Sequence, residues 1–261
     1  MIELFAFTRQ LIDLPSTSGG EQEVALFLAE HLEGLGYRVE LQEVAPARMN
    51  LLARTDDVPR VVLSTHMDTV PPHIASVEDE EFIYGRGACD AKGIIAAQIA
   101  AATILRAEGF DQLGLLFTVD EELGSLGARA ANNHPMAEDC RYLINGEPTD
   151  NKLATGSKGS LRVRLKTSGR AAHSAYPEHG ESAIEKLLDV LSDLRAARWP
   201  QDSFLGTTTC NIGTIAGGSQ PNVIPAHAEA ALHLRLVTDS ARVKESLEEI
   251  IAGRAQVEYL S

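Results

Sequence analysis

The chain has 261 residues, 44% of them hydrophobic, and a formal net charge of −14. This length predicts one large or two smaller domains, and the hydrophobic content is enough for a buried core. The negative charge argues against a nucleic-acid-binding protein, which needs a basic surface to meet phosphates. It also argues against binding to anionic membrane surfaces.

The N-terminus and the cysteines bear on targeting and on disulfide bonding. The first residues contain Glu3 and no basic stretch, so we expect no signal peptide. The most apolar stretch, residues 94–105, is too short to cross a bilayer. The cysteines Cys89, Cys140 and Cys210 are widely spaced and odd in number. We therefore expect free thiols and a cytoplasmic protein.

Helix and strand patterns alternate along the first half of the chain. A segment resembling a capping box, from Ser18 to Glu21, precedes apolar residues at helical spacing that stop near Gly36. An alanine-rich helix is predicted over residues 92–108, and residues 122–132 have weaker helical character. The alternation predicts a mostly parallel sheet with helices on both faces. Its strands are expected at residues 38–44, 50–54, 60–65, 113–119 and 141–145.

A different pattern begins after Gly156–Gly159, where a linker is expected. The later part of the chain has the order strand, helix, strand, strand, helix, strand, which predicts a ferredoxin-like unit. We therefore expect a domain over residues 1–156 and a second domain over residues 157–261. The predicted elements of the second domain are residues 161–167, 182–196, 207–215, 226–237, 240–252 and 257–260.

Histidine and acidic residues form four clusters in the first domain. Three clusters directly follow a predicted strand, and the fourth lies in the glycine-rich loop that opens the alanine-rich helix. Because ligands bind at the carboxyl ends of parallel strands, we expect these side chains to meet at one edge of the sheet. The clustered residues are His66, Asp68, Asp90, Glu121, Glu122 and Glu147.

Five carboxylates in one place would repel one another without a counter-charge. Arg86 and Lys92 are too few to balance them, whereas bound divalent cations would. Mixed histidine and carboxylate ligands are typical of catalytic zinc. Each residue alone also suits a structural role, such as a helix cap or a partner of a helix dipole. Their combination at one sheet edge indicates a metal site.

Five motifs then occur in order: STHMDTVPP, GRGACDAKG, TVDEELGSLGA, NGEPT and AAHSAYPEHGESAI. They resemble the successive motifs of a zinc-dependent exopeptidase and deacylase family. This family includes acetylornithine deacetylase, succinyl-diaminopimelate desuccinylase, aminoacylase and glutamate carboxypeptidase. The resemblance extends from the N-terminus to about residue 240. It implies an α/β zinc domain, a smaller ferredoxin-like lid inserted in that domain, and a homodimer formed through the lid.

The resemblance also implies which residues hold two zinc ions, for which cobalt may substitute. His66 and Glu147 resemble the ligands of one zinc. Glu122 resembles a ligand of the other, and Asp90 resembles the carboxylate that bridges both. The substrate implied is a small N-acyl amino acid or peptide.

Two further residues of the first domain resemble catalytic groups. Asp68 would orient the ring of His66 through its second nitrogen. Glu121 would act as the general base that takes a proton from water and returns it to the leaving amine. A second metal ligand is the alternative role for Glu121.

Three residues of the second domain resemble lid residues of the family. His173 corresponds to a histidine that reaches a substrate carbonyl, often in the partner subunit's site. Asn222 and Arg235 resemble residues that bind the substrate's carboxylate, for which the arginine fork is well suited. The structural alternatives are a solvated loop histidine for His173 and an exposed strand charge for Arg235.

One feature of the family has no counterpart here. The second zinc takes a histidine from a segment after the lid, and neither His227 nor His233 matches that motif. We therefore expect the C-terminal part of the catalytic domain to be absent from this sequence, with weak binding of the second metal and low activity. In the family, a glutamate at the position of Glu147 is associated with deacylases and carboxypeptidases, whereas an aspartate is more typical of aminopeptidases and dipeptidases, so the resemblance favours the former.

The leading hypothesis is a metal-dependent deacylase similar to acetylornithine deacetylase. The alternatives are a carboxypeptidase or desuccinylase of the same family, or an inactive remnant that acts as a dimerisation or binding module.

Overall fold

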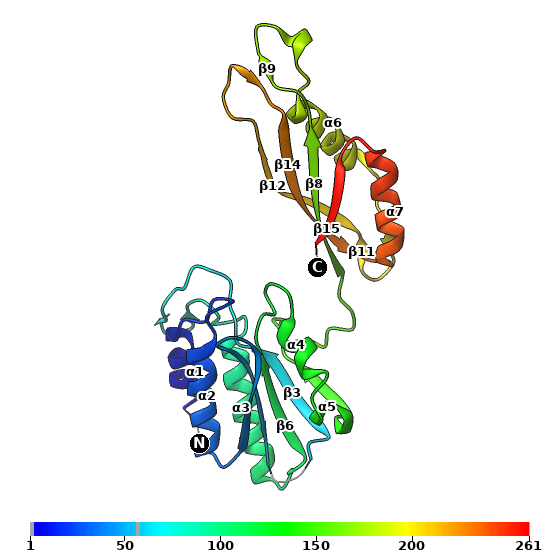
Figure 1. Ribbon diagram of the computed structural model, residues 1–261. Helices are drawn as coiled ribbons and strands as arrows, with labels where there is room; N and C mark the ends of the chain where they lie inside the picture. The colour runs from blue at the N-terminus through cyan, green and yellow to red at the C-terminus, as the bar shows by residue number, and fades with distance from the viewer. Residues whose placement is uncertain (1–2, 56–57, 261) are drawn as a thin grey trace. The chain divides into compact units, whose positions relative to one another are not determined.

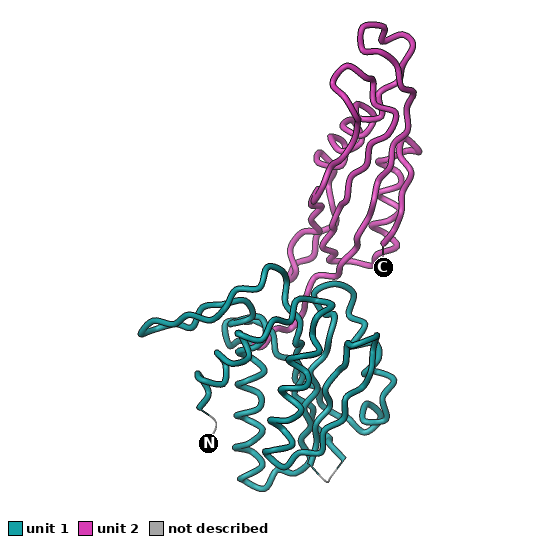
Figure 2. The backbone as a smooth tube through the Cα atoms, turned by 60° about the vertical axis from the view of Figure 1, so that its left-hand side comes forward, with its two compact units in different colours: residues 1–152 teal, residues 153–261 magenta. Residues whose placement is uncertain are grey.

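The computed structural model describes residues 3–55 and 58–260. The chain divides into two compact units, with the boundary between Lys152 and Leu153 (Figure 2). Each unit has its own cluster of buried hydrophobic side chains. Since a separate core is what defines a domain, the two units are described separately.

A five-stranded sheet lies at the centre of the first unit, in the order β1-β2-β6-β3-β7 (Figure 1). β6, β3 and β7 are parallel neighbours, whereas β2 is antiparallel to both β1 and β6. Of these five strands, β2 therefore runs against the other four, so the predicted mostly parallel sheet is confirmed with one exception. The strands are β1 (Arg38–Ala45), β2 (Arg48–Arg54), β3 (Val61–His66), β6 (Leu113–Thr118) and β7 (Tyr142–Asn145).

Helices cover both faces of this sheet (Figure 1). Leu115 and Phe117 of β6 pack into the core formed with α1 (Leu4–Asp13), α2 (Gln22–Gly34) and α3 (Lys92–Ala107). Leu116, between them, points to the opposite face, as alternation along a strand requires. That face is next to α4 (Leu126–Ala131) and α5 (Met136–Asp139). A small hairpin, β4 (Val77–Glu78) and β5 (Ile83–Tyr84), precedes α3.

Two local predictions in this unit are wrong. α2 begins at Gln22 with Glu21 as its N-cap residue, and no side chain caps it. The hydroxyl of Ser18 donates instead to Asp68 Oδ2 at 2.7 Å, so there is no capping box. The helix expected from residue 122 starts only at Leu126, because a tight turn with positive φ at Asp120 and Ser125 occupies the preceding residues.

The second unit contains a four-stranded antiparallel sheet in the order β12-β14-β8-β15. α6 and α7 pack on one face, over buried residues such as Leu161, Val163 and Leu165 of β8. The βαββαβ order agrees with the predicted ferredoxin-like unit. Its elements are β8 (Gly159–Ser168), α6 (Ala183–Ala196), β12 (Thr209–Gly217), β14 (His227–Leu236), α7 (Ser240–Ile251) and β15 (Gln256–Leu260).

Shorter elements complete the second unit. β9 (Ala172–His173) pairs with β13 (Val223–Ile224), and the 3₁₀ helix η1 (Pro177–His179) follows β9. β10 (Gln201–Asp202) and β11 (Gly206–Thr207) form a separate hairpin. Across the described residues of both units, none of the helices is long and apolar enough to cross a membrane.

Candidate metal centre

The ends of three parallel strands bring the predicted site residues of the first unit together. His66 is the last residue of β3, Glu121 follows β6, and Glu147 follows β7. Since β6, β3 and β7 are parallel neighbours, these residues leave the sheet at one edge. Asp90 reaches the same place from the loop before α3, and its peptide bond to Ala91 is cis.

A compact group of ligand atoms lies at this edge. Nε2 of His66 is 2.9 Å from Asp90 Oδ1 and 3.9 Å from Glu147 Oε2. One ligand atom each of His66, Asp90 and Glu122 lies within 4.8 Å of the other two. This spacing and the imidazole and carboxylate chemistry fit a divalent cation bound among the three side chains.

Asp68 connects the end of β3 to the segment after β6. Its buried carboxylate accepts the backbone N–H groups of Glu121 at 3.0 Å and Glu122 at 3.1 Å, besides the hydroxyl of Ser18. Nδ1 of His66 lies 2.8 Å from the carbonyl oxygen of Asp68 and 3.5 Å from its carboxylate. The nearer contact to the ring is therefore the backbone carbonyl, and it holds Nδ1 as the donor and leaves Nε2 for a ligand.

Electrostatics at the site favour a positive charge. Burial first, and then neighbouring carboxylates that include Asp90 in each case, raise the pKa values of three glutamates, which are Glu121, Glu122 and Glu147. Burial opposes a charge on His66, but the hydrogen bond and charge of Asp68, followed by Asp90, raise the pKa of His66 to about 10. The same surroundings would favour a metal ion.

Two basic side chains near the site point elsewhere. Lys92 is buried and donates to the carbonyl of Leu14, and burial lowers the pKa of Lys92 to about 8. Arg86 donates to the carbonyl of Pro72 at 3.1 Å. Neither forms its hydrogen bond with the clustered carboxylates, which agrees with the sequence argument that a cation must balance them.

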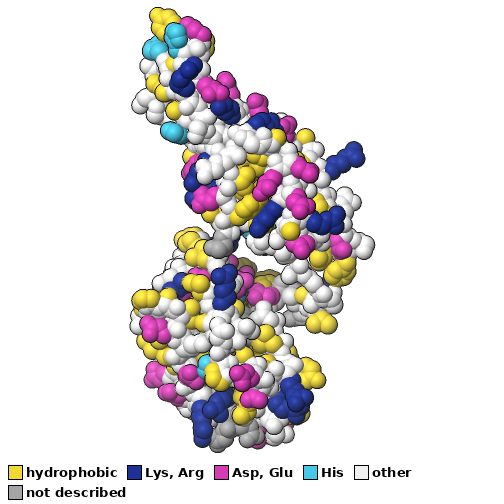
Figure 3. Space-filling view, turned by 45° about the vertical axis from the view of Figure 1, so that its right-hand side comes forward, with side chains coloured by type: hydrophobic (Ala, Val, Ile, Leu, Met, Phe, Trp, Pro, Cys, Tyr) yellow, Lys and Arg dark blue, Asp and Glu magenta, His cyan; other side chains and the backbone are white. Residues whose placement is uncertain are grey.

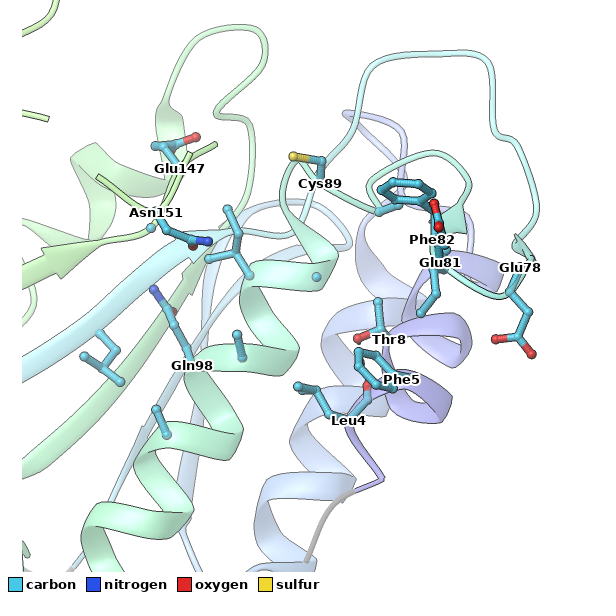
Figure 4. A pocket seen from close by; sticks show the side chains of 18 of the residues that line it. Leu4, Phe5, Thr8, Glu78, Glu81, Phe82, Cys89, Gln98, Glu147 and Asn151 are labelled. Carbon is cyan, nitrogen blue, oxygen red and sulfur yellow. Dashed lines mark hydrogen bonds between the residues drawn. The ribbon is translucent and has the colours of Figure 1, made fainter. Parts of the chain in front are cut away.

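Two cavities adjoin the site. One of about 470 Å³ lies on the α4 and α5 face, and both His66 and Glu121 line it. A larger one, of about 860 Å³, lies between α3, the β4–β5 hairpin and the start of α1 (Figure 4). Glu147 lines both, so it stands where the two cavities adjoin. Of the clustered residues, His66, Glu121 and Glu147 line the smaller cavity, whereas Glu147 alone lines the larger one.

Glycine is required just before Glu147. A Cβ on Gly146 would collide with side chains of α3, those of Ile94 and Gln98. The Gly146 N–H also donates to the carbonyl of Ser64 at 2.7 Å. These contacts draw the end of β7 against β3 and α3, and so place Glu147 beside His66.

Buried and partly buried polar residues that no sequence pattern indicated support the site. The amide group of Asn50, in β2, donates to the carbonyl of Gly127 at 2.8 Å and accepts the N–H of Val119 at 3.1 Å. Arg48 contacts Glu21 and Asp120. Neither Asn50 nor Arg48 belongs to a motif, because their partners lie tens of residues away. The one sequence feature that pointed to this supporting contact is the position of Asp120, directly before Glu121 and Glu122.

In the second unit, the structure brings His173 and Asn222 together. His173 pairs with Val223 between β9 and β13, and the N–H of Ser174 donates to the carbonyl of Asn222 at 3.0 Å. The His173 ring lies near Tyr176, with ring centroids 6.1 Å apart. Histidine side chains gather at this end of the unit (Figure 3).

Arg235 is not near these two residues. It lies towards the far end of β14, opposite Thr209 and Ser160 of the flanking strands, whereas β14 begins at His227 near the loop that holds Asn222. The two residues predicted to bind one carboxylate therefore occupy opposite ends of the second unit's sheet.

Known proteins resemble this chain in both sequence and fold. A model of the peptidase dimerisation domain of the M20 family matches residues 155–258, and a model of peptidase family M28 matches residues 50–193. A peptidase M20 domain-containing protein of Schizosaccharomyces pombe is 39% identical over 255 residues, covering 95% of this chain and 64% of that protein. A probable carboxypeptidase of Aspergillus terreus is 38% identical over 284 residues, covering 97% of this chain and 66% of that protein.

The chain thus spans a little under two thirds of the length of these relatives. Among solved structures, an M20 family metallo-carboxypeptidase from Sulfolobus solfataricus superimposes with a TM-score of 0.78 at 18% identity, covering 99% of this chain and 78% of that chain. This likeness establishes the fold. Together with the sequence matches, it shows that the chain belongs to the M20 family of metallopeptidases.

Proposed function

We propose that this chain belongs to a metal-dependent amide hydrolase whose substrates release an amine that bears a free α-carboxylate. The observation that carries the proposal is the group formed by His66, Asp90 and Glu122, with ligand atoms within 4.8 Å of one another. Residues 1–156 would form the metal-binding domain and residues 157–261 the lid. A homodimer through the lid is supported by the matching dimerisation domain.

The metal is proposed to be zinc, with two ions in the site. His66 and Glu147 would hold one ion, Glu122 the other, and Asp90 would bridge them. This assignment is supported by the short distances from His66 Nε2 to Asp90 and Glu147. It is also supported by the number of carboxylates, which exceeds what one tetrahedral ion with an open position needs. When bound, zinc would polarise the substrate carbonyl and make a water molecule more acidic.

Residues of the chain would perform the proton transfers and hold the substrate. Glu121 takes a proton from the attacking water and returns it to the leaving amine. Asp68 keeps Glu121 in place through the backbone N–H at 3.0 Å, and it fixes the His66 ring through its carbonyl group. His173 donates a hydrogen bond to the substrate carbonyl oxygen, which becomes negative during the attack.

Two substrate classes share the required free carboxylate. The first is a small N-acyl amino acid such as N-acetylornithine, which the sequence motifs favour. The second is a short peptide that loses its C-terminal residue, which is favoured by the relative named as a probable carboxypeptidase. In either class, Asn222 or Arg235 would bind the carboxylate. Asn222 lies in the loop before β14 and Arg235 lies near the end of β14. One of the two, rather than both, would therefore contact the carboxylate in a given lid.

Metal content and turnover test the proposal together. The chain is loaded with zinc or cobalt, its metal content is measured by mass spectrometry, and free amine release is followed. The panel contains N-acetylornithine, other N-acyl amino acids and dipeptides, each paired with its C-terminal amide. Bound metal with turnover of the free acids only is the expected result, and the best substrate decides between the two classes. A chain that binds no metal and hydrolyses nothing would instead support a binding module.

A further inference from the structure

We propose that Arg48 is a positioning residue for the metal centre: it fixes the turn that carries Glu121 and Glu122 by holding the carboxylate of Asp120. This inference rests on the proposed function, since it concerns how that centre keeps its geometry. Arg48 lies at the start of β2, and it contacts Asp120 without touching the clustered ligands themselves.

The three side chains form a buried ionic group. Arg48 donates from Nε to Glu21 Oε2 at 2.9 Å and from Nη2 to Glu21 Oε1 at 2.5 Å. The same Nη2 is 2.9 Å from Asp120 Oδ1. The side chains of Glu21 and Asp120 are 0% and 5% exposed, and that of Arg48 is 14% exposed. Carboxylates this buried are tolerated only when they are paired, so the guanidinium group of Arg48 is the partner that holds both acids in place.

Asp120 organises the turn that follows β6. Its backbone has a φ of +67°, in the left-handed region that a non-glycine residue keeps only where surrounding contacts hold it. Its carbonyl accepts the N–H groups of Gly124 at 3.1 Å and Ser125 at 2.5 Å. Its second carboxylate oxygen accepts the N–H of Leu126, the first residue of α4, at 3.2 Å. The orientation of this one side chain therefore determines the path from the end of β6 to α4.

The turn is held from two sides. Asp68, after β3, accepts the N–H groups of Glu121 and Glu122, and Arg48, in β2, holds the preceding residue. Asp68 alone fixes the N–H groups of Glu121 and Glu122, but it does not fix the backbone conformation of the preceding residue, Asp120. Without Arg48, the buried Asp120 side chain would lose its partner and turn towards solvent, and the Glu122 carboxylate would leave the position that it shares with His66 and Asp90. Metal sites tolerate displacements of only about 0.5 Å.

The test uses cobalt binding, because the absorption spectrum of bound Co²⁺ reports its ligand geometry directly. The main variant combines Arg48→Met with Glu21→Gln, which removes the arginine without leaving a buried charge on Glu21. The control is Arg106→Met, which removes a partly buried arginine of α3 that donates to the Leu35 carbonyl and stacks on Tyr37. It has no contact with the turn. Thermal unfolding of each metal-free protein confirms that it is folded at the temperature of titration.

The double variant is expected to bind Co²⁺ about 10- to 100-fold more weakly and to show an altered spectrum, as removal of supporting contacts around a metal usually does. Arg106→Met is expected to bind like the wild type. If the folded double variant keeps the wild-type affinity and spectrum, Arg48 serves only the fold and the inference is wrong.

Failure of the proposed function gives a different result. In that case the wild-type chain itself does not bind Co²⁺. Amide hydrogen exchange of residues 120–126 in the metal-free proteins then tests Arg48 independently. Exchange at least about tenfold faster in the double variant than in the wild type or in Arg106→Met supports positioning of the turn, whereas equal rates in all three contradict it.

Discussion

Glu121 and Glu122 are adjacent in sequence, yet the structure gives them different places. Glu122 offers an oxygen to the group with His66 and Asp90, whereas Glu121 lines the neighbouring cavity. We predict that Glu122→Gln weakens Co²⁺ binding at least about tenfold, because it replaces a charged ligand atom. Glu121→Gln should keep the affinity and lower turnover about 10²- to 10⁴-fold, the usual effect of losing a general base.

Isothermal titration and the substrate panel separate the two effects. Both substitutions preserve shape and the backbone N–H groups bound by Asp68, so each serves as the control for the other. Equal loss of cobalt binding in both variants would show that Glu121 is a metal ligand, which is the alternative role left open by the sequence.

The partly buried ring of His31, in α2, is expected to make the free energy of unfolding depend on pH. Its ring stacks on Phe7 with centroids 4.2 Å apart, and its buried Nε2 has no hydrogen-bond partner among the described residues. Burial lowers the pKa of His31 below its ordinary value of 6.5. The unfolded chain therefore binds the proton more readily than the folded chain. The contribution of His31 to the free energy of unfolding is complete above pH of about 6.5 and is lost as the pH falls through the lower, folded pKa.

The variant His31→Phe isolates this effect, since it keeps an aromatic ring against Phe7 and cannot be protonated. Denaturant unfolding at several pH values between about 5 and 7.5 should show a smaller loss of stability on acidification for the variant than for the wild type. Parallel pH dependences for the two proteins would rule out His31 as a contributor.

At the residue scale, the sequence identified side chains with unusual chemistry better than it identified their partners. The acidic and histidine residues are recognisable because three of their clusters follow a strand and Asp90 lies in a glycine-rich loop before a helix, and the structure brings His66, Asp90 and Glu122 together. Ser18 was assigned to a helix cap because local spacing suggested one. Its true partner, Asp68, is 50 residues away, and contacts of that kind leave no periodic signal.

At the scale of elements, β7 is an exposed edge strand. It pairs with β3 on one side, and Tyr142, Leu143 and Ile144 are 67%, 59% and 56% exposed. Edge strands with uncovered apolar side chains promote association between chains. We predict that Leu143→Lys reduces concentration-dependent light scattering of the isolated chain and leaves its melting temperature nearly unchanged.

Leu188→Lys is the matched control for this substitution. Leu188 is 51% exposed on α6 of the second unit, so it changes the net charge equally without altering β7. A similar drop in scattering for both variants would mean that net charge, rather than the edge of β7, governs association.

The boundaries of helices and strands are predictable where the hydrophobic residues follow a single clear pattern. α3 and β6 were predicted to within two residues, because an alanine-rich amphipathic segment and an apolar run each favour one structure. The direction of β2 was not predictable from its composition. It follows from the two-residue connection at positions 46 and 47, which can join only antiparallel strands. The short pairing of β9 with β13 depends on residues about 50 positions apart and had no local signal.

At the scale of the whole molecule, the change of pattern from alternating helices and strands to a βαββαβ unit was visible in the sequence. The two buried clusters show the physical reason, because each unit encloses its own apolar residues and needs no core residue from the other. The sequence does not show which edge strand of the second sheet, β12 or β15, is available to a partner, because polar and apolar residues alternate along both strands.

The structure favours the β12 edge for the proposed homodimer. Ile215 of β12 pairs with Ala230 of β14, whose side chain is buried on the face covered by the helices. Ile215 lies on that same face, yet it is 54% exposed. A second copy paired edge to edge would cover it and satisfy the open strand. β15, at the opposite edge, is mostly half-buried.

We therefore predict that Ile215→Lys converts the dimer to a monomer in sedimentation velocity, whereas Gln256→Lys on β15 leaves it dimeric. A lysine at Ile215 would bring two like charges into the new sheet and remove the apolar contact. Cobalt binding by the first unit should be the same in both variants, because its ligands lie outside the second unit. If Gln256→Lys alone produced a monomer, the interface would lie at β15. If the monomeric Ile215→Lys variant bound cobalt but no longer hydrolysed substrate, the lid of one subunit would complete the site of the other.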